Sequence, residues 1–435
     1  MQPDPFTYGN PIRDPGRFYG RDHEVAQIFG RLRNSEFESS SVVGDRRIGK
    51  TSLLNYIAHP ETRLAHGLEG DQYIFVYADL QMVGRTMGPE QLWRQLLGSL
   101  LDQCRDDAIA AALKELLGQE RLDTFDLDQF FRKVDARGYS VVFLLDEFEQ
   151  ITGNTNFGPD FFFGFRSLAI HRKVALVTSS RLELVELCHS DSVKSSPFFN
   201  IFANINLRML SPEGFMSLIT QSLNPTGVHF TDREVDQILG LAGRHPYFVQ
   251  MVCSLLYEAY RLGLDTDARE IFLGERFSAE AASHFFDLWG SSTDPHRIVL
   301  TSASLLEQRS RPSAEFTVES LQRVYARAVP TLVGLERRGL VMRTGTGYRL
   351  FSSALGPWIV DQIVAQADER QGFAEWLAQD ADARRRVTGW RRKRLRKLLP
   401  KIGPSYRQLI LTWASDPQSV TAMARLLKSV LSTVS

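Results

Sequence analysis

The stretch of sequence that decides the fold is Val42-Val43-Gly44-Asp45-Arg46-Arg47-Ile48-Gly49-Lys50-Thr51-Ser52-Leu53-Leu54. Gly44, four intervening residues and then Gly49-Lys50-Thr51 have the spacing of a phosphate-binding P-loop. Glycines allow a tight turn in which successive backbone N–H groups point toward an anion. In such a loop Lys50 places a positive charge on the terminal phosphates, and the Thr51 hydroxyl binds Mg²⁺. The alternative is a surface turn that matches the pattern by chance.

The residues on both sides of this loop agree with a phosphate site. Residues 39–43 predict a short strand that enters the loop, and residues 51–57 predict a helix that leaves it. The N-terminus of such a helix favours phosphate through its dipole. The predicted nucleotide-binding residues of this segment are Gly44, Arg47, Gly49, Lys50, Thr51 and Ser52.

A second motif is a continuous apolar run that ends in two acids, Ser140-Val141-Val142-Phe143-Leu144-Leu145-Asp146-Glu147. Such a run is typical of a central parallel strand. In P-loop enzymes the first acid, here Asp146, holds Mg²⁺ through water, and the second, Glu147, polarises the attacking water. The alternative is that two exposed acids merely end a strand.

Two further runs predict buried strands with polar ends. Residues 72–79 end in an acid, and residues 173–181 end in Thr178-Ser179-Ser180-Arg181. Ligands bind at the carboxyl ends of central parallel strands, so Arg181 would lie near the P-loop and read a γ-phosphate with its guanidinium fork. Pairing with a surface acid such as Glu183 is the alternative for Arg181.

The segment before the P-loop contains a second candidate for the nucleotide site. Residues 1–16 are rich in Pro, Gly and Asp and predict an extended lead-in. Residues 17–24, Arg17-Phe18-Tyr19-Gly20-Arg21-Asp22-His23-Glu24, then precede a helical pattern that runs through Leu32. This box is either part of a nucleotide pocket or a helix cap with an aromatic staple.

The pattern becomes helical after residue 210. Residues 211–213 and the capping box at 231–234 begin helices, and Gly243-Arg244-His245-Pro246 begins another, so residues 211–293 predict a small helical lid. Residues 294–360 predict a winged helix, with helices at 296–306, 317–327 and 330–338 and a glycine-turned hairpin at 340–351. Winged helices often bind DNA through a basic helix. The candidate helix at 331–338 has two basic residues and one acid, which favours protein packing or nucleotide gating over DNA.

The tail from residue 361 to residue 435 predicts a small all-helical interaction module. Its first part is acidic, and residues 384–397 form a basic run without an acid. Such a run is a solvated face, an intramolecular partner for acids, or a site that binds nucleic acid or an anionic surface.

The bulk composition bounds the remaining function classes. A chain of 435 residues is expected to form more than one domain, and its 51 basic and 51 acidic residues balance. Cys104, Cys188 and Cys253 form no metal-ligand pair and are expected to be reduced thiols of a cytoplasmic protein. No apolar run approaches the ~18 residues of a membrane helix, and no second catalytic motif is found.

Taken together, these motifs resemble the STAND class of AAA+-related signalling ATPases and, more loosely, the Orc/Cdc6-type ATPases. The resemblance covers about residues 17–360. It implies an α/β P-loop core at 17–210 with a parallel sheet. It also implies that Tyr19, Gly20 and Arg21 line the adenine pocket, that Pro246 packs on adenine, and that Arg181 senses the γ-phosphate. Residues 350–354 lack the Met-His-Asp element with which many relatives hold ADP.

The resemblance also implies a function. It predicts a slowly hydrolysing ATPase that takes ATP or ADP with Mg²⁺ and self-associates when active. Such proteins act in signalling and, in many bacterial relatives, in defence, and the C-terminal module would recruit an effector protein. The competing interpretation is an Orc/Cdc6-like ATPase that binds DNA through the winged helix and the basic run.

Overall fold

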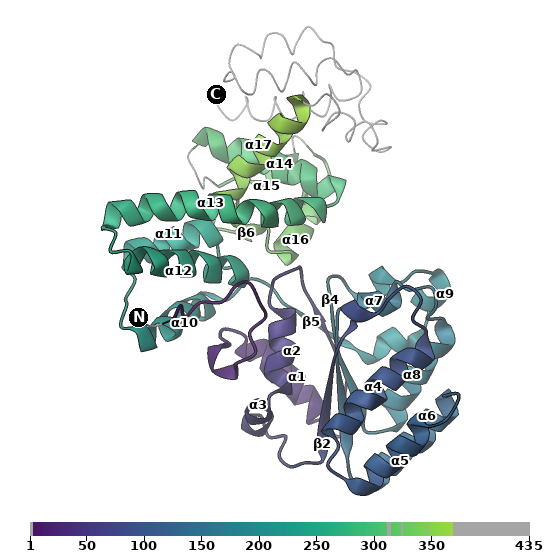
Figure 1. Cartoon of the computed structure of the whole chain (residues 1–435). Coiled ribbons are helices and arrows are strands. Elements are labelled where there is room, and N and C mark those ends of the chain that lie inside the picture. The colour runs from purple at the N-terminus through teal and green to yellow at the C-terminus, as the bar shows by residue number, and fades with distance from the viewer. Residues whose placement is uncertain (1–2, 311–314, 323–324, 346, 369–435) are drawn as a thin grey trace, which may run out of the picture. The chain divides into compact units, whose positions relative to one another are not determined.

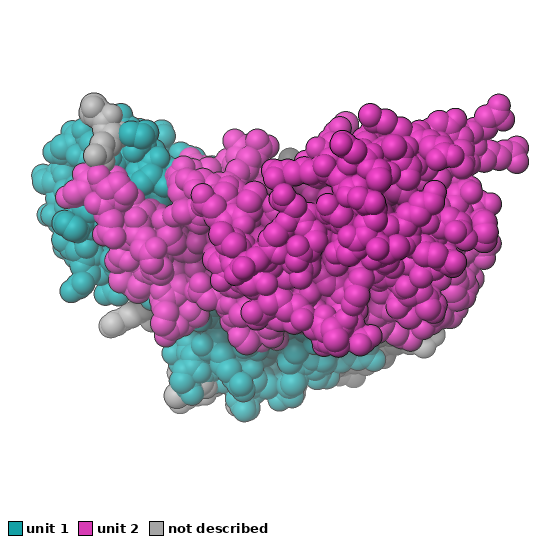
Figure 2. Space-filling view, turned by 90° about the horizontal axis from the view of Figure 1, so that it is seen from below, with its two compact units in different colours: residues 1–6, 228–435 teal, residues 7–227 magenta. Residues whose placement is uncertain are grey.

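The structure is a computed structural model, and it describes residues 3–310, 315–322, 325–345 and 347–368 (Figure 1). Its contacts divide the chain into two compact units. We call residues 7–227 the first unit (magenta in Figure 2), and residues 1–6 together with residues 228–435 the second unit (teal in Figure 2). The chain therefore passes between the units twice, after Phe6 and after Gly227.

The first unit is built on a five-stranded parallel sheet with the strand order β2-β3-β4-β1-β5. The strands are β1 (Ser40–Val43), β2 (Tyr73–Asp79), β3 (Ser140–Asp146), β4 (Val174–Ser180) and β5 (Ala203–Asn206). This confirms the predicted parallel α/β core. Because β4 lies between β1 and β3, the segments that follow these two strands meet at the end of β4.

Both faces of the sheet are covered by helices, which explains the continuous apolar strands. Val141, Phe143 and Leu145 of β3 belong to one core, and Val142 and Leu144 belong to the other. Figure 1 shows α4 (Pro89–Gln103) and α8 (Pro159–His171) on the first face, and α1 (Asp22–Leu32) and α2 (Lys50–Ala58) on the second.

Strand register decides which polar side chains share a face. Tyr77, Leu144 and Val177 are register partners, and side chains alternate between faces with a period of two residues. Asp146 and Ser179 therefore lie on the same face as Tyr77, the face covered by α2. This places all three at the carboxyl end of the sheet beside the P-loop helix.

The other helices of this unit are short or peripheral. Their bounds are α3 (Pro60–Ala65), α5 (Asp107–Leu117), α6 (Thr124–Ala136), α7 (Glu149–Thr152), α9 (Asp191–Lys194) and α10 (Pro212–Leu223). Helix α6 begins at Thr124, where Asp123 forms a capping box with Asp126.

The second unit begins with three helices, α11 (Asp232–Ala242), α12 (Pro246–Arg261) and α13 (Thr266–Gly290). Thr231 caps α11 in the predicted capping box with Glu234, and the buried Glu234 also pairs with Arg269 at 2.8 Å. The predicted lid begins at residue 211, whereas the contact division places α10 in the first unit. The other predicted domain boundaries stay predictions.

Next come α14 (Asp294–Ser310), α15 (Val318–Gln322), α16 (Ala328–Arg337) and an antiparallel hairpin of β6 (Val341–Arg343) and β7 (Tyr348–Leu350). The order of these elements is the predicted one, although residues 325–327 of the helix predicted at 317–327 are not helical. The assignment as a winged helix stays a prediction. Helix α17 (Leu355–Asp368) runs across the predicted domain boundary at residue 360.

The N-terminal lead-in is tied to both units. In the second unit, Ser254 Oγ donates to Asp4 Oδ2 at 2.5 Å, and Phe6 stacks on Phe230. In the first unit, Ile12 N donates to Ser52 Oγ at 3.0 Å, on the first turn of α2. Residues 7–11 connect these two attachments.

Most of the predicted C-terminal module, including the basic run at 384–397, lies outside the described residues. Within the described part of the chain, no helix combines the length and the apolar character that crossing a bilayer requires.

Candidate nucleotide-binding site

The P-loop is a tight turn between β1 and α2. Gly44 N donates to Ser180 O at 3.1 Å, which fixes the start of the loop to the end of β4. A Cβ atom on Gly44 would lie 2.7 Å from Ile48 Cγ2, so close approach requires glycine there. Gly49 has a φ of +103° and Arg47 a φ of +62°, and these left-handed residues close the turn before α2 begins at Lys50.

The side chain of Lys50 points into this turn. It is 5% exposed, and its Nζ donates to Gly44 O at 3.0 Å and to Asp45 O at 3.3 Å. Among the described residues, the hydrogen bonds of this buried ammonium group go to neutral carbonyl oxygens. A phosphate oxygen is a stronger, charged acceptor, so this loop fits an anion.

Asp146 ends β3 as a buried carboxylate in a fixed orientation. Its Oδ2 accepts from Tyr77 Oη at 3.1 Å, and its Oδ1 accepts from Ser179 Oγ and from Glu147 N. Burial, followed by the charge of Asp146, raises the pKa of Tyr77 and keeps this phenol a donor. Neighbours that orient a carboxylate are typical of sites that hold a metal directly or through water.

Glu147 follows in a strained backbone conformation, with a φ of +55°. Its N–H donates to Ser179 Oγ at 3.1 Å, and the next residue, Phe148, donates its N–H to Ser179 O at 2.8 Å. Burial raises the pKa of Glu147, Lys50 opposes the increase, and Glu149 and Asp146 add to it. A carboxyl group with a raised proton affinity suits a general base.

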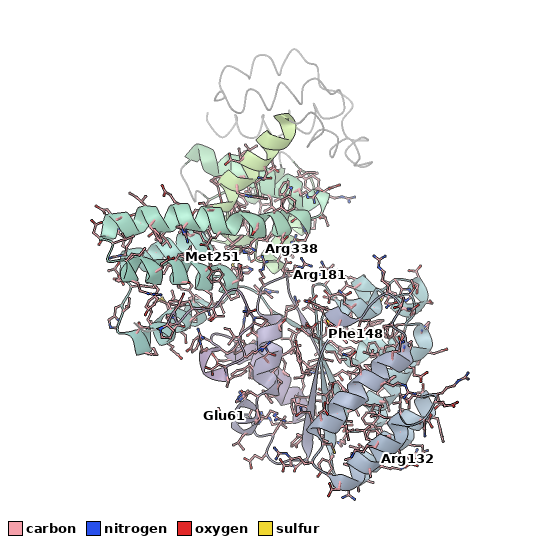
Figure 3. All side chains as sticks on the ribbon, in the orientation of Figure 1. Glu61, Arg132, Phe148, Arg181, Met251 and Arg338 are labelled. Carbon is pink, nitrogen blue, oxygen red and sulfur yellow. The ribbon has the colours of Figure 1, made fainter. Side chains whose placement is uncertain are left out.

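Arg181 directly follows β4 and lies beyond its carboxyl end (Figure 3). Its Nε donates to Glu149 Oε1 at 3.0 Å, and its backbone N–H donates to the same oxygen at 3.3 Å. Glu149 is almost fully buried, whereas the Arg181 side chain is 41% exposed. Arg181 thus pairs with an acid, as the alternative expects, but this acid is the buried Glu149 and not a surface acid such as Glu183. Its contact with a γ-phosphate stays a prediction.

The upstream box packs behind the P-loop. Arg21 is 5% exposed, and its Nη2 donates to Ile48 O at 3.1 Å and to Arg208 O at 2.7 Å. Gly20 has a φ of +74°, and a Cβ atom there would lie 2.8 Å from Gly214 Cα. Tyr19 donates its hydroxyl to Gly16 O. Arg21 thus supports the loop from inside the unit, and the adenine contacts of the box stay a prediction.

The remaining predicted residues are placed as follows. Thr51 and Ser52 lie half-buried in the first turn of α2, and Arg47 is exposed on the loop. Pro246 is the first residue of α12 and belongs to the other unit, so its predicted packing on adenine stays a prediction.

Sequence reasoning missed three residues that shape this site: Tyr77, Ser179 and Glu149. For Tyr77, alternation along the strand at 72–79 was the available signal, because Tyr77 and Asp79 share a face. Ser179 was part of the polar strand end that includes Arg181. The sequence shows Glu149 as the next acid after Glu147, but no known motif spacing predicts a role for an acid at this position.

Comparison with known proteins identifies the family. Residues 34–301, which are more than half of the chain and contain all five strands of the sheet, match the family described as novel STAND NTPase 2. The chain belongs to this family. The match confirms the resemblance to STAND-class ATPases that the P-loop and the acid pair indicate.

Two solved structures share the fold of this STAND NTPase at 14% sequence identity. A Walker-type ATPase of Pyrococcus abyssi has a TM-score of 0.52, with 81% of this chain and 98% of that chain covered. The ORC2 protein of Aeropyrum pernix, solved in ADPNP–ADP complexes, also has a TM-score of 0.52, with 84% and 98% covered. These likenesses show the P-loop NTPase fold.

One curated relative matches part of the sequence of this STAND NTPase. Origin recognition complex subunit 1 of Candida albicans is 22% identical over 181 residues, which are 40% of this chain. The match spans only 20% of the length of that protein.

Proposed function

We propose that this STAND NTPase binds ATP with Mg²⁺, hydrolyses it slowly and acts as a molecular switch. The observation that carries the proposal is the meeting of two motifs on consecutive residues of β4. Gly44 of the P-loop donates to Ser180 O, and Glu147 of the acid pair donates to Ser179 Oγ. A phosphate chain held at the loop therefore lies close to the two acids.

Each residue then has a role in phosphoryl transfer. The loop amides and Lys50 bind the phosphates, and Thr51 with Asp146 holds Mg²⁺, which neutralises charge on the phosphate oxygens when bound. Glu147 orients a water molecule and accepts its proton. Arg181 binds the γ-phosphate through its terminal nitrogens and distinguishes ATP from ADP.

The switch requires that ATP and ADP stabilise different conformations, since a ligand shifts an equilibrium only by its differential affinity. In the proposed cycle, the ATP state self-associates and recruits an effector protein through the C-terminal module, in signalling or defence. The family match and the helical segments after the core support this proposal.

Two measurements test the proposal. ATP binding and hydrolysis of the wild type establish the activity, with Lys50→Ala as the variant that weakens binding. The mass of the protein in solution with ADP, ATP and a non-hydrolysable ATP analogue then tests assembly. An unchanged mass in all three states would rule out the self-associating switch.

An Orc-like DNA-binding ATPase is the second candidate, supported by the sequence similarity to the Candida albicans origin recognition subunit. One observation weighs against α16 as the DNA-reading helix. The adjoining Arg338 is engaged internally, since it donates to Ser292 Oγ at 2.8 Å and to Ser291 Oγ at 2.9 Å. The test is salt-dependent duplex binding that disappears when the basic residues of 391–397 are neutralised.

A further inference from the structure

We propose that Glu149 is a positioning residue of this site, which fixes the Arg181 side chain so that its terminal nitrogens are left for an oxygen of the bound nucleotide. The inference rests on the proposed nucleotide function and adds to it a residue outside the P-loop and the acid pair. Glu149 orients Arg181, whereas Asp146 is proposed to hold Mg²⁺ and Glu147 to act as the base.

The first argument is the way in which Arg181 is held. A single oxygen, Glu149 Oε1, accepts both from Arg181 N at 3.3 Å and from Arg181 Nε at 3.0 Å. This anchors the side chain at its backbone and at the near side of its guanidinium group. Among the described residues, Nε makes all the hydrogen bonds of the Arg181 side chain, so Nη1 and Nη2 remain as a fork for an anionic oxygen.

The second argument is burial. An exposed arginine that pairs with an exposed acid contributes little and does not hold one geometry. Here the acid is only 5% exposed and is the first residue of α7, two residues after Glu147. Removing the partner of a buried carboxylate is costly, so the pair is expected to persist.

The third argument concerns the second oxygen of Glu149. Glu149 Oε2 is buried, and no N–H or O–H donor among the described residues reaches it. In the described part of the chain, the hydrogen bonds to this carboxylate therefore come from Arg181, and both go to Oε1.

The experiment compares Glu149→Gln, Arg181→Ala and the double variant in the full-length chain. Glu149→Gln is expected to lower kcat by about 10- to 100-fold, the effect of misplacing a positioned group, with little change in KM. It is also expected to reduce the preference for ATP over ADP. If Glu149 acts through Arg181, the double variant has the kcat of Arg181→Ala. Glu186→Gln, the same change at an exposed acid of this region, serves as the matched control and is expected to match the wild type.

The inference would be overturned if the decrease in kcat of the double variant equalled the product of the two single decreases. A wild-type kcat and ATP preference in Glu149→Gln would also overturn it. If Glu149→Gln does not fold, the ATP preference of Arg181→Lys provides the test. Lysine keeps the positive charge beside Glu149 but lacks the two terminal nitrogens of the guanidinium group. Loss of ATP preference in Arg181→Lys supports the inference, and a wild-type preference refutes it. A wild type that binds no ATP would instead refute the proposed function.

Discussion

Lys50 Nζ donates a hydrogen bond to the carbonyl oxygen of Gly44 at 3.0 Å, and thus connects the first residue of α2 to the first residue of the P-loop. The positive charge of Lys50, which the sequence motif predicts to bind the terminal phosphates, therefore lies inside the turn. Because the contact is made to neutral backbone, exchanging it for phosphate oxygens strengthens the bonds of Lys50.

Lys50→Ala is expected to weaken ATP binding by about 3 kcal/mol, on the order of 100-fold in Kd, because a charged hydrogen-bond donor is lost. Titration with a fluorescent ATP analogue measures this change. Lys173→Ala is the matched control, since Lys173 precedes β4, away from the strand end where the P-loop lies, and donates to Ser35 O. Equal affinity in the two variants would contradict the assignment of Lys50.

Glu147→Gln is expected to keep ATP binding and to lower the hydrolysis rate by roughly 100-fold or more, because the amide cannot accept a proton. The wild-type rate should rise with pH as Glu147 deprotonates, and this rise should lie above the ordinary range of a glutamate because burial raises its pKa. Steady-state rates across pH 5–9 measure both effects. A rate that falls with pH over this range would exclude Glu147 as the base.

Ser179→Ala is expected to raise the Mg²⁺ concentration for half-maximal activity by about tenfold, since residues that orient a metal-site carboxylate typically have effects of this size. The Ser179 hydroxyl bonds both Asp146 Oδ1 and the backbone N–H of Glu147, so its loss leaves both groups less fixed. Ser192→Ala, on the surface of the same unit, is the control. An unchanged magnesium requirement would contradict the assignment of Asp146 as a residue that holds Mg²⁺.

Glu307→Gln is expected to change the pH dependence of stability. Burial raises the pKa of Glu307 to about 7 from an ordinary 4.5, opposed by the bond from Leu350 N and by the charge of Arg349. The folded state thus binds a proton that the unfolded state releases, and stability falls as pH rises from about 4.5 to 7. The loss is on the order of 3 kcal/mol.

Unfolding of the wild type and of Glu307→Gln, measured from pH 5 to pH 8, tests this prediction. The variant keeps an oxygen that accepts from Leu350 N, so its stability should lack this pH-dependent loss and exceed that of the wild type at pH 8. A constant difference between the two proteins over this range would show that Glu307 does not titrate there.

The sequence was sufficient for the parts of the site that are local. The P-loop is defined by the spacing of Gly44, Gly49 and Lys50, and the acid pair by an apolar strand that ends at Asp146. Both signals lie within a few residues of one another, because a turn and a strand end are formed by consecutive residues. The parallel sheet followed from the same apolar strands.

Contacts between distant segments were not accessible from the sequence. Arg21 bonds the carbonyl oxygens of Ile48 and Arg208, and Arg181 bonds Glu149, since the strand order β3-β4-β1 brings these segments together. Nothing in the spacing of Glu149 and Arg181 distinguishes this pair from Arg181 with Glu183. The choice is made by the packing of α7 against the end of β4.

The lead-in has a mechanical consequence for the molecule. Asp4 and Phe6 attach it to one unit and Ile12 attaches it to the first turn of α2, so the short tether of residues 7–11 ends on the helix that follows the P-loop. A protease that nicks the connection at 224–227 would leave two fragments that are still joined through this tether.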